Sequence, residues 1–320
     1  MRVVSLGSGS SGNAFLVEAG PQGRTKLLLD AGLSTRMLTT RLASVGVSLA
    51  QIQGILVTHE HSDHVQGIPT LLKSQRMPVI ADMRTLKAIQ EGVRTGVWRT
   101  DSGRVVRAKF QDESAVLATM QTTEIVGTTM LLEEGDISVV TPETSTAIKL
   151  PHQELPAGSR LKIGDIEITS FAISHDATAP CGFLLQAGGC RVCLVTDSGE
   201  VTPTMLEHMQ HADLLILESN HDRERLWRGP YPWHLKHRII SATGHLSNDQ
   251  AGEAVLKIWR ERGMRWLWLA HLSRTNNTPG LALESMRLYL RAAHVNLAYI
   301  KIVALPPTLG QIWDSTQLWQ

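Results

Sequence analysis

The sequence predicts a layered α/β fold. Short apolar runs bounded by glycine or polar residues indicate buried strands, and segments with apolar residues at helical spacing alternate with them. Hydrophobic residues make up 42% of the 320-residue chain, which is enough for a substantial core. Strands and helices that alternate in this way are typical of sheets covered by helices.

Residues 1–60 contain four expected strands, at 3–6, 14–17, 26–29 and 55–57. A glycine-rich loop at 7–13 lacks the Lys-Ser/Thr ending of a P-loop, so we expect a turn between strands. Ser34 is placed to cap a helix, because apolar residues follow it at helical spacing. A helix face at 65–72, a strand at 79–80 and a helix at 83–89 complete this part.

The segment 94–151 differs from the rest of the chain. It is rich in Thr, Val, Glu and Gly, and it has strand-like pieces at 105–108, 129–132 and 137–140 but no convincing helix. We therefore expect an insertion or an extra hairpin layer within a single domain that spans residues 1–320.

Strands are expected again at 166–173, 182–186, 191–195, 214–217 and 266–270. Ser247 and Gln250 have the spacing of a capping box, and the apolar face that follows predicts a helix at 251–259. A helix is expected at 279–292, followed by a final strand at 297–303.

Charge and cysteine content narrow the class of protein. The 31 basic and 30 acidic side chains give a net charge of +1, which excludes a generic polycation. Apolar runs of about 18 residues, as in a membrane span, and a secretory signal are both missing from the sequence. Cys181, Cys190 and Cys193 are too few for a disulfide framework, so we expect a cytoplasmic protein. Cys190 and Cys193 should face opposite sides of a strand, which argues against a zinc pair.

The most informative feature is a histidine-rich loop directly after the strand at 55–57. His59, His61, Asp63 and His64 lie within six residues there. Ordinary hydrogen bonds cannot satisfy so many imidazoles in one loop, whereas neutral imidazole and carboxylate are preferred ligands of zinc and similar ions. The loop predicts a metal site.

Two ions need more ligands than this loop supplies, since one ion takes about four. Three further candidates follow later strands: His175, Asp197 and His271. The same placement recurs at each, which favours a shared metal centre over three isolated polar residues.

These residues resemble the metallo-β-lactamase-fold hydrolases. The resemblance implies a four-layer αββα sandwich. It also implies, by analogy with ribonuclease Z and related nucleases, one ion on His59, His61 and His175. A second ion would lie on Asp63, His64 and His271, with Asp197 bridging. Asp30 is similar to a residue that orients the histidine loop without binding metal.

The resemblance is closer to the YycJ-like exonucleases and covers most of 1–93 and 155–310. It includes the loop 7–13 and the segments 57–64, 174–177, 218–222, 231–233, 244–248 and 270–273. It implies a 5′–3′ exonuclease that acts on DNA rather than RNA. The segment 94–151 departs from the subgroup, where this connection is shorter.

The implied reaction uses a hydroxide shared by two ions to attack phosphorus. The leaving 3′-oxygen then needs a proton, and His245 is the best donor candidate. Glu218 matches a residue that pairs with such a histidine, which would raise its pKa and fix its tautomer. Asp63 is expected in catalysis as well as metal binding. Hydrogen bonds to a substrate phosphate are expected from Ser247, Asn248, Asn276 and Asn277, although capping and turn formation explain these residues equally well.

Partner signals are weaker. Between 223 and 238, Arg223, Arg225, Arg228, Lys236 and Arg238 surround Trp227, Tyr231 and Trp233. Such interleaving suits a nucleic-acid backbone and its bases, and a plain helical surface explains it equally well.

Two other functions stay open. A metallo-hydrolase of thioesters, lactones or β-lactams uses the same fold, and Asp63-His64 does not separate it from a nuclease. The His245–Glu218 pair favours the nuclease. A non-catalytic partner protein is disfavoured by the complete ligand set. Histidine-rich ligation favours zinc, with manganese as the other candidate, and the oligomeric state is left open.

Overall fold

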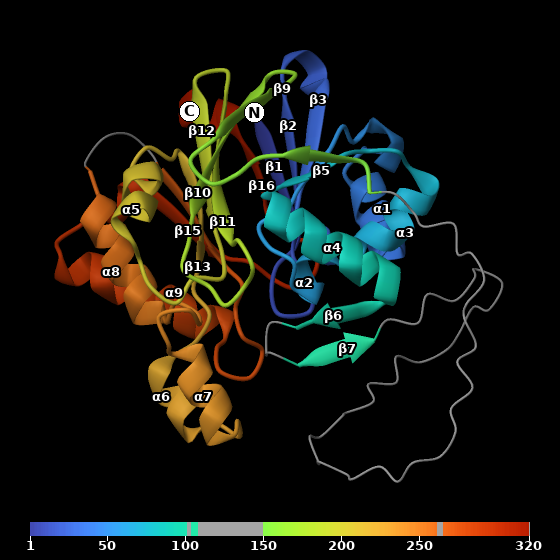
Figure 1. Ribbon diagram of the computed structural model, residues 1–320. Coiled ribbons are helices and arrows are strands. Elements are labelled where there is room, and N and C mark those ends of the chain that lie inside the picture. The colour runs from blue at the N-terminus through green and yellow to red at the C-terminus, as the bar shows by residue number, and fades with distance from the viewer. Residues whose placement is uncertain (101–103, 108–149, 261–264, 320) are drawn as a thin grey trace, which may run out of the picture.

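The computed structural model describes residues 1–100, 104–107, 150–260 and 265–319 (Figure 1). Its centre is a pair of seven-stranded mixed sheets. The first has the order β16-β1-β2-β3-β4-β5-β8, with β1 Arg2–Gly7, β2 Ala14–Ala19, β3 Thr25–Leu29, β4 Ile55–Leu56, β5 Val79–Ala81, β8 His152–Glu154 and β16 Ile312–Asp314. The second has the order β15-β14-β13-β12-β11-β10-β9, with β9 Arg160–Ile163, β10 Ile166–Ala172, β11 Cys181–Ala187, β12 Cys190–Val195, β13 Leu214–Glu218, β14 Arg265–Ala270 and β15 Ile300–Ala304.

Helices cover the outer face of each sheet (Figure 1). The first sheet is covered by α1 Thr35–Ser44, α3 Ile68–Ser74 and α4 Met83–Thr95, with the short α2 Ser62–Val65 at one end. The second is covered by α5 Pro203–Met209, α8 Asn248–Ile258 and α9 Pro279–Ala292. The predicted four-layer αββα sandwich is confirmed.

Three apolar cores follow from this layering. Phe15 and Val17 of β2 face the core between the sheets, while Ala14 and Leu16 face the core beneath α1, α3 and α4. A third core lies beneath α5, α8 and α9. Strands that are buried on both faces need continuous apolar runs, which is why these strands could be recognised in the sequence.

The parallel strands end at one edge of the sandwich. β3 and β4 are parallel neighbours, as are β12, β13 and β14. Two hydrogen bonds join the sheets at this edge: Cys181 N–H donates to the Thr58 carbonyl at 3.0 Å, and His271 N–H donates to Ser8 Oγ at 2.9 Å. Loops that follow parallel strands gather at such an edge, where α/β proteins place their sites.

Most expected elements are present. Ser34 accepts a hydrogen bond from Met37 N–H as the cap of α1, and Ser247 and Gln250 form the predicted capping box of α8. The helix face at 65–72 is divided between α2 and α3, because Gly67 N–H donates to Ala31 instead of continuing a helix. Sequence patterns did not reveal β8, β9, α5 or the helices α6 Arg223–Arg228 and α7 Trp233–Ile239, all of them short.

The end of the chain required a correction. The expected final strand at 297–303 begins as a 3₁₀ turn, Leu297–Tyr299, capped by Asn296, and β15 starts only at Ile300. It is also not the last strand, because β16 follows and pairs antiparallel with β1. β16 was missed because it has three residues and only its central Trp313 is buried.

Within 94–151, the described residues form the hairpin β6 Val97–Arg99 and β7 Val105–Arg107, which confirms the expected strand at 105–108. The expected strands at 129–132 and 137–140 lie outside the described residues. That this segment is an insertion in a single domain stays a prediction. No helix in the described part of the chain is both long and apolar enough to span a membrane.

Cys190 packs in the core between the sheets, and Cys193 packs in the core beneath α5, α8 and α9. The two side chains therefore lie on opposite faces of β12, as expected from their spacing. All three cysteines are buried and free.

Candidate metal centre

The histidine loop occupies the turn between β4 and α3. His61 stands at the N-terminal cap position of α2, and its carbonyl accepts a hydrogen bond from His64 N–H at 2.9 Å. This tight helical turn points Asp63 and His64 toward the space beyond the strand ends. His59, His61 and His64 are fully buried, and Asp63 is nearly so.

The three later candidates come to the same place. His175 follows β10, and its Nε2 lies 3.3 Å from Nδ1 of His61. Asp197 follows β12, and its Oδ2 lies 3.1 Å from Nε2 of His64. His271 follows β14, and its Nε2 lies 3.3 Å from Oδ2 of Asp63. All seven side chains expected from the sequence thus converge in one buried cluster.

The donor atoms divide into groups whose members lie within 4.8 Å of one another. His59, His61 and His175 form one group, and Asp63, His64 and His271 form another. Asp197 groups with His59 and His64, one residue from each set. Asp197 also groups with Glu218, His245 and His271. The expected sets His59, His61, His175 and Asp63, His64, His271 thus each lie together, while the assignment of an ion to each set stays a prediction.

The protonation states also suit divalent cations. Burial, and then the charges of nearby imidazoles, hold the pKa of His59 well below its usual value, so the ring is neutral and able to bind metal. Its Nε2 is buried and has no hydrogen-bond partner within the described residues. Burial raises the pKa of Asp197, but His271 and His64 outweigh it and hold that pKa well below its usual range. An ionised carboxylate among imidazoles fits zinc or a similar ion.

Asp30 supports the cluster from behind. Its Oδ2 lies 2.8 Å from Nδ1 of His64, and its Oδ1 accepts from Thr58 N–H at 2.8 Å. Burial opposes protonation of His64, yet Asp30, Asp197 and Asp63 together raise its pKa well above the usual value. A cation on Nε2 would take the place of the ring proton, which is how carboxylate–histidine pairs orient metal ligands.

The backbone is strained at this edge. Asp30, Asp197 and His271 have φ of 57°, 57° and 53°, in the left-handed region that non-glycine residues rarely adopt. Asp30 and His271 directly follow β3 and β14, and Asp197 stands two residues after the end of β12. Such strain persists where the surrounding structure fixes it, and it concentrates at functional sites.

Two supporting residues were not identified from the sequence. Asn13 Nδ2 lies 3.2 Å from Nε2 of His64, and Asn13 Oδ1 accepts from Gly9 N–H at 2.8 Å, so the loop 7–13 contacts the centre. Gly32 packs against the histidine loop, where a Cβ would lie 1.6 Å from the Asp63 carbonyl oxygen. The glycines of the loop 7–13 and the single Gly32 after β3 were the available signals.

His245 and Glu218 form the expected pair. Nδ1 of His245 lies 2.8 Å from Oε1 of Glu218, and both side chains are buried. Oε1 also lies 3.0 Å from Nδ1 of His271. Burial raises the pKa of Glu218, but the charge and hydrogen bond of His245, with a hydrogen bond from His271, lower it below its usual value. Glu218 is therefore a carboxylate between two imidazoles.

The four residues expected to bind phosphate lie around the start of α8. Ser247 Oγ accepts from Gln250 N–H at 3.2 Å. Asn248 Oδ1 accepts from Ser219 Oγ at 2.6 Å and from Asn277 Nδ2 at 2.8 Å. The buried amide of Asn276 has no hydrogen-bond partner in the part of the chain that the structure describes. Capping explains Ser247 and internal hydrogen bonds explain Asn248 and Asn277, while their contact with substrate stays a prediction.

His221 was also overlooked. It is buried, and its Nδ1 lacks a hydrogen-bond partner among the described residues. Burial, followed by the charge of His245, lowers its pKa to about 4. It is a neutral imidazole near His245 at ordinary pH.

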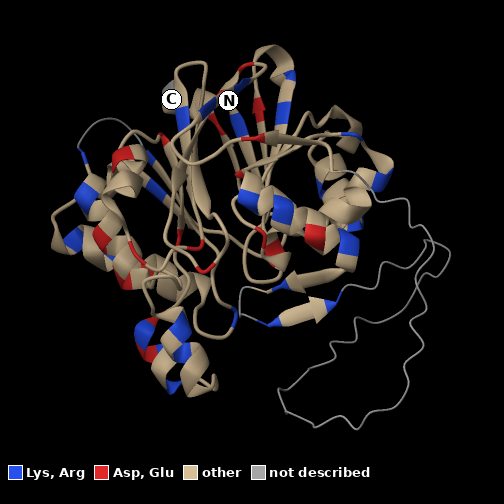
Figure 2. Ribbon diagram, viewed as in Figure 1, with Lys and Arg blue, Asp and Glu red and all other residues tan. Residues whose placement is uncertain are grey.

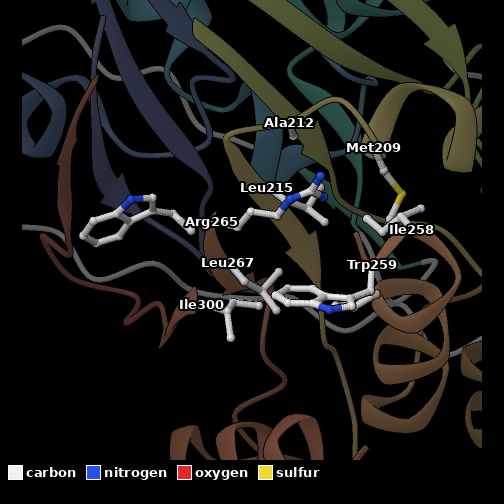
Figure 3. A pocket seen from close by; sticks show the side chains of 10 residues that line it. Met209, Ala212, Leu215, Ile258, Trp259, Arg265, Leu267 and Ile300 are labelled. Atoms are coloured by element: carbon white, nitrogen blue, oxygen red, sulfur yellow. The ribbon is translucent and has the colours of Figure 1, made fainter. Parts of the chain in front are cut away.

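A small cavity lies far from this cluster, under α8 (Figure 3). Met209, Leu215, Ile258 and Leu267 line it, and its volume of about 20 Å³ holds one water at most. It is a packing gap in the core beneath the outer helices.

The sandwich and its buried histidine–aspartate cluster define a metal-dependent hydrolase. A family model described as the metallo-beta-lactamase superfamily matches residues 7–209, and the chain belongs to this superfamily. It is 33% identical over 281 residues to exodeoxyribonuclease WalJ of Streptococcus pneumoniae, covering 88% of this chain and 85% of that protein. Exodeoxyribonuclease YycJ of Bacillus anthracis is 31% identical over 281 residues, covering 88% and 86%.

More distant relatives share the fold. Ribonuclease Z of Pyrobaculum aerophilum is 28% identical over 202 residues, covering 61% of this chain and 62% of that protein. The metallo-beta-lactamase fold protein YhfI of Bacillus subtilis superposes with a TM-score of 0.60 at 15% identity, covering 98% of this chain and 99% of that one. Human tRNase Z, short form, gives 0.52 at 17% identity, covering 86% and 93%.

Proposed function

We propose that this protein is a cytoplasmic 5′–3′ exodeoxyribonuclease that uses two divalent ions, zinc foremost and manganese as the alternative. The relatives named exodeoxyribonuclease support DNA as the substrate. The observation that carries the proposal is the buried His245–Glu218 pair, which adjoins the metal ligand groups through Glu218 and His271. Three free cysteines accord with a reducing compartment.

The proposal assigns one ion to each of the two ligand sets. His59, His61 and His175 would hold one, Asp63, His64 and His271 the other, and Asp197 would bridge them. Such ions would supply a nucleophilic hydroxide near neutral pH and would offset charge on the phosphate oxygens.

The protein's own groups handle the leaving 3′-oxygen. Glu218 accepts the Nδ1 proton of His245, which directs the ring's Nε2 to act as the proton donor. The carboxylate also favours the protonated ring. A proton delivered at Nε2 lets the 3′-oxygen leave as a hydroxyl, which is the work of a general acid.

We propose that phosphate contacts come from Ser247, Asn248, Asn276 and Asn277. Asn276 is the first to test, because its buried amide is not engaged within the described residues. The N-terminus of α8 adds partial positive charge beside Ser247.

The test is an end-labelled assay combined with metal analysis. Single- and double-stranded DNA and RNA, with 5′-phosphate or 5′-hydroxyl ends, are compared on purified protein loaded with zinc or manganese. We expect mononucleotides released from a 5′-labelled DNA strand at the earliest time points. Internal cleavage, or faster turnover of RNA, would contradict the proposal. If the protein hydrolysed a thioester, lactone or β-lactam but did not hydrolyse DNA, the alternative metallo-hydrolase function would be favoured.

A further inference from the structure

An exposed aromatic surface lies on the hairpin of α6 and α7. We define the aromatic face as Trp227, Trp233 and His237. Trp227 is 38% exposed and Trp233 is 67% exposed. Their ring centroids are 5.2 Å apart, and the His237 ring lies 4.6 Å from Trp233. Exposure of two neighbouring indoles is unfavourable in water, so this face is suited to a partner.

The surroundings of the aromatic face are basic. Residues 223–240 contain five Lys and Arg against one Glu, whereas the whole chain has a net charge of only +1. Lys236 is buried and Arg238 pairs with Asp176, so the exposed basic side chains are Arg223, Arg225 and Arg228. Figure 2 shows this concentration on α6 and α7. Arg228 is 80% exposed at its side chain and pairs with Glu224 at 2.6 Å, which is a weak surface pair that a phosphate could replace.

The hairpin is fixed to the metal centre. Arg238 of α7 makes two hydrogen bonds of 2.8 Å to the carboxylate of Asp176, the neighbour of His175. The Ile239 carbonyl accepts from His245 N–H at 2.8 Å. Lys236 Nζ donates to the Trp227 carbonyl at 2.6 Å and ties the two helices together. Figure 1 shows the hairpin projecting from the sandwich at the end where α2 lies. The aromatic face therefore has a set orientation relative to the proposed general acid.

We propose that the aromatic face stacks unpaired bases of single-stranded DNA while its backbone is cleaved at the metal centre. Aromatic rings among basic side chains bind single strands by stacking, whatever the base. Bases inside a duplex stack on one another and offer no free face, so the proposed contact requires unpaired bases, as in a single strand or at a frayed duplex end. This inference rests on the proposed nuclease function.

The experiment measures binding of the metal-loaded full-length protein to a nuclease-resistant phosphorothioate oligothymidine by fluorescence anisotropy. We expect Trp233→Ala to weaken binding about tenfold or more. Trp233→Phe keeps an aromatic ring and should retain most of the affinity. Retained affinity would show that substitution at this position does not unfold the hairpin. Tyr299→Ala, which removes another half-exposed aromatic ring, should bind as the unaltered protein does.

An abasic strand of equal length separates stacking from charge. It keeps the phosphates, so Trp233→Ala should change its affinity little. Equal binding of oligothymidine by Trp233→Ala and the unaltered protein would overturn the inference. If Trp233 were needed for binding to anionic phospholipid vesicles but not for binding to DNA, the aromatic face would be a membrane-binding surface. That result would also overturn the inference. Failure of the nuclease proposal is read separately, as absent hydrolysis of ordinary DNA by the unaltered protein.

Discussion

Glu218 Oε1 lies 2.8 Å from Nδ1 of His245, and both side chains are buried at the edge of the metal-ligand cluster. The same oxygen is 3.0 Å from Nδ1 of His271. One carboxylate therefore orients both the proposed general acid and one proposed metal ligand, which links proton transfer to the geometry of the centre.

Glu218→Gln should keep the metal and lose turnover by about a hundredfold or more, in the range of general acid catalysis. The amide can still contact the ring but carries no charge. The protonated form of His245 is then less favoured, so the ring loses its proton at lower pH. As pH rises, the activity of the variant should therefore begin to fall at a lower pH than the activity of the unaltered protein. The pH profile of kcat measures this, with Glu284→Gln on the exposed face of α9 as the control. Lost metal would instead make Glu218 a ligand.

His245→Ala should bind both ions and lose about 10²–10⁴-fold in kcat on DNA. The substitution removes the proton donor but none of the seven expected ligands. Metal content by mass spectrometry and kcat on end-labelled DNA are measured together. His211→Ala, at an exposed position after α5, provides a matched control. Unchanged turnover would remove His245 from the mechanism.

Asp30→Asn should weaken metal affinity by about 10–100-fold, as loss of a partner behind a metal ligand does. Asn tolerates the left-handed backbone and can still accept from Thr58, so the fold should be kept. It cannot supply the charge that Oδ2 places 2.8 Å from His64. Competition with a chelator of known affinity measures the change. Asp165→Asn, an equivalent change far from the centre at the salt bridge to Arg24, should leave the affinity unaltered.

Apolar runs predicted a layered α/β fold because the central strands are buried on both faces, whereas the four-layer sandwich was implied by the family resemblance. The run Ala14-Phe15-Leu16-Val17, for example, alternates between two cores. Short elements such as β16, with one buried residue, left no comparable pattern. The position of β16 depends on its pairing with β1, a contact between the two ends of the chain.

The seven clustered side chains were predictable because they follow strands and carry metal-binding chemistry, and the structure brings them together. Asn13 and His221 were not identified, because their residue types and neighbours indicate no metal-binding role, although Asn13 ends a glycine-rich loop. Their importance comes from contacts across the fold, such as the 3.2 Å approach of Asn13 Nδ2 to His64 Nε2. The left-handed backbone at Asp197 and His271 is likewise fixed by tertiary structure.

The cysteine thiols should be unreactive in the folded protein. Burial raises the pKa of Cys181 to about 12, so almost no thiolate exists at neutral pH, and Cys190 and Cys193 are buried as well. A disulfide reagent should label all three rapidly in guanidinium chloride and only slowly without it. Because the unfolded thiol ionises near its ordinary pKa and the folded one does not, burial of Cys181 should also lower stability as pH rises above that ordinary value. Rapid labelling of the folded protein would contradict its burial.

Removal of the ions should lower the melting temperature, and zinc should restore it in a concentration-dependent way. The ring centroids of His59 and His64 are 4.1 Å apart in this buried cluster. Bound metal ions would stabilise so close a group of imidazoles. A ligand that binds only the folded state adds about 2.7 kcal/mol per site at a hundredfold excess over Kd. Thermal unfolding after dialysis against chelator, followed by zinc titration, measures the shift. His59→Ala should show a smaller shift because one ligand set is incomplete, whereas His211→Ala should match the unaltered protein. If zinc did not change the melting temperature of the unaltered protein or of any variant, the seven side chains would not bind an ion.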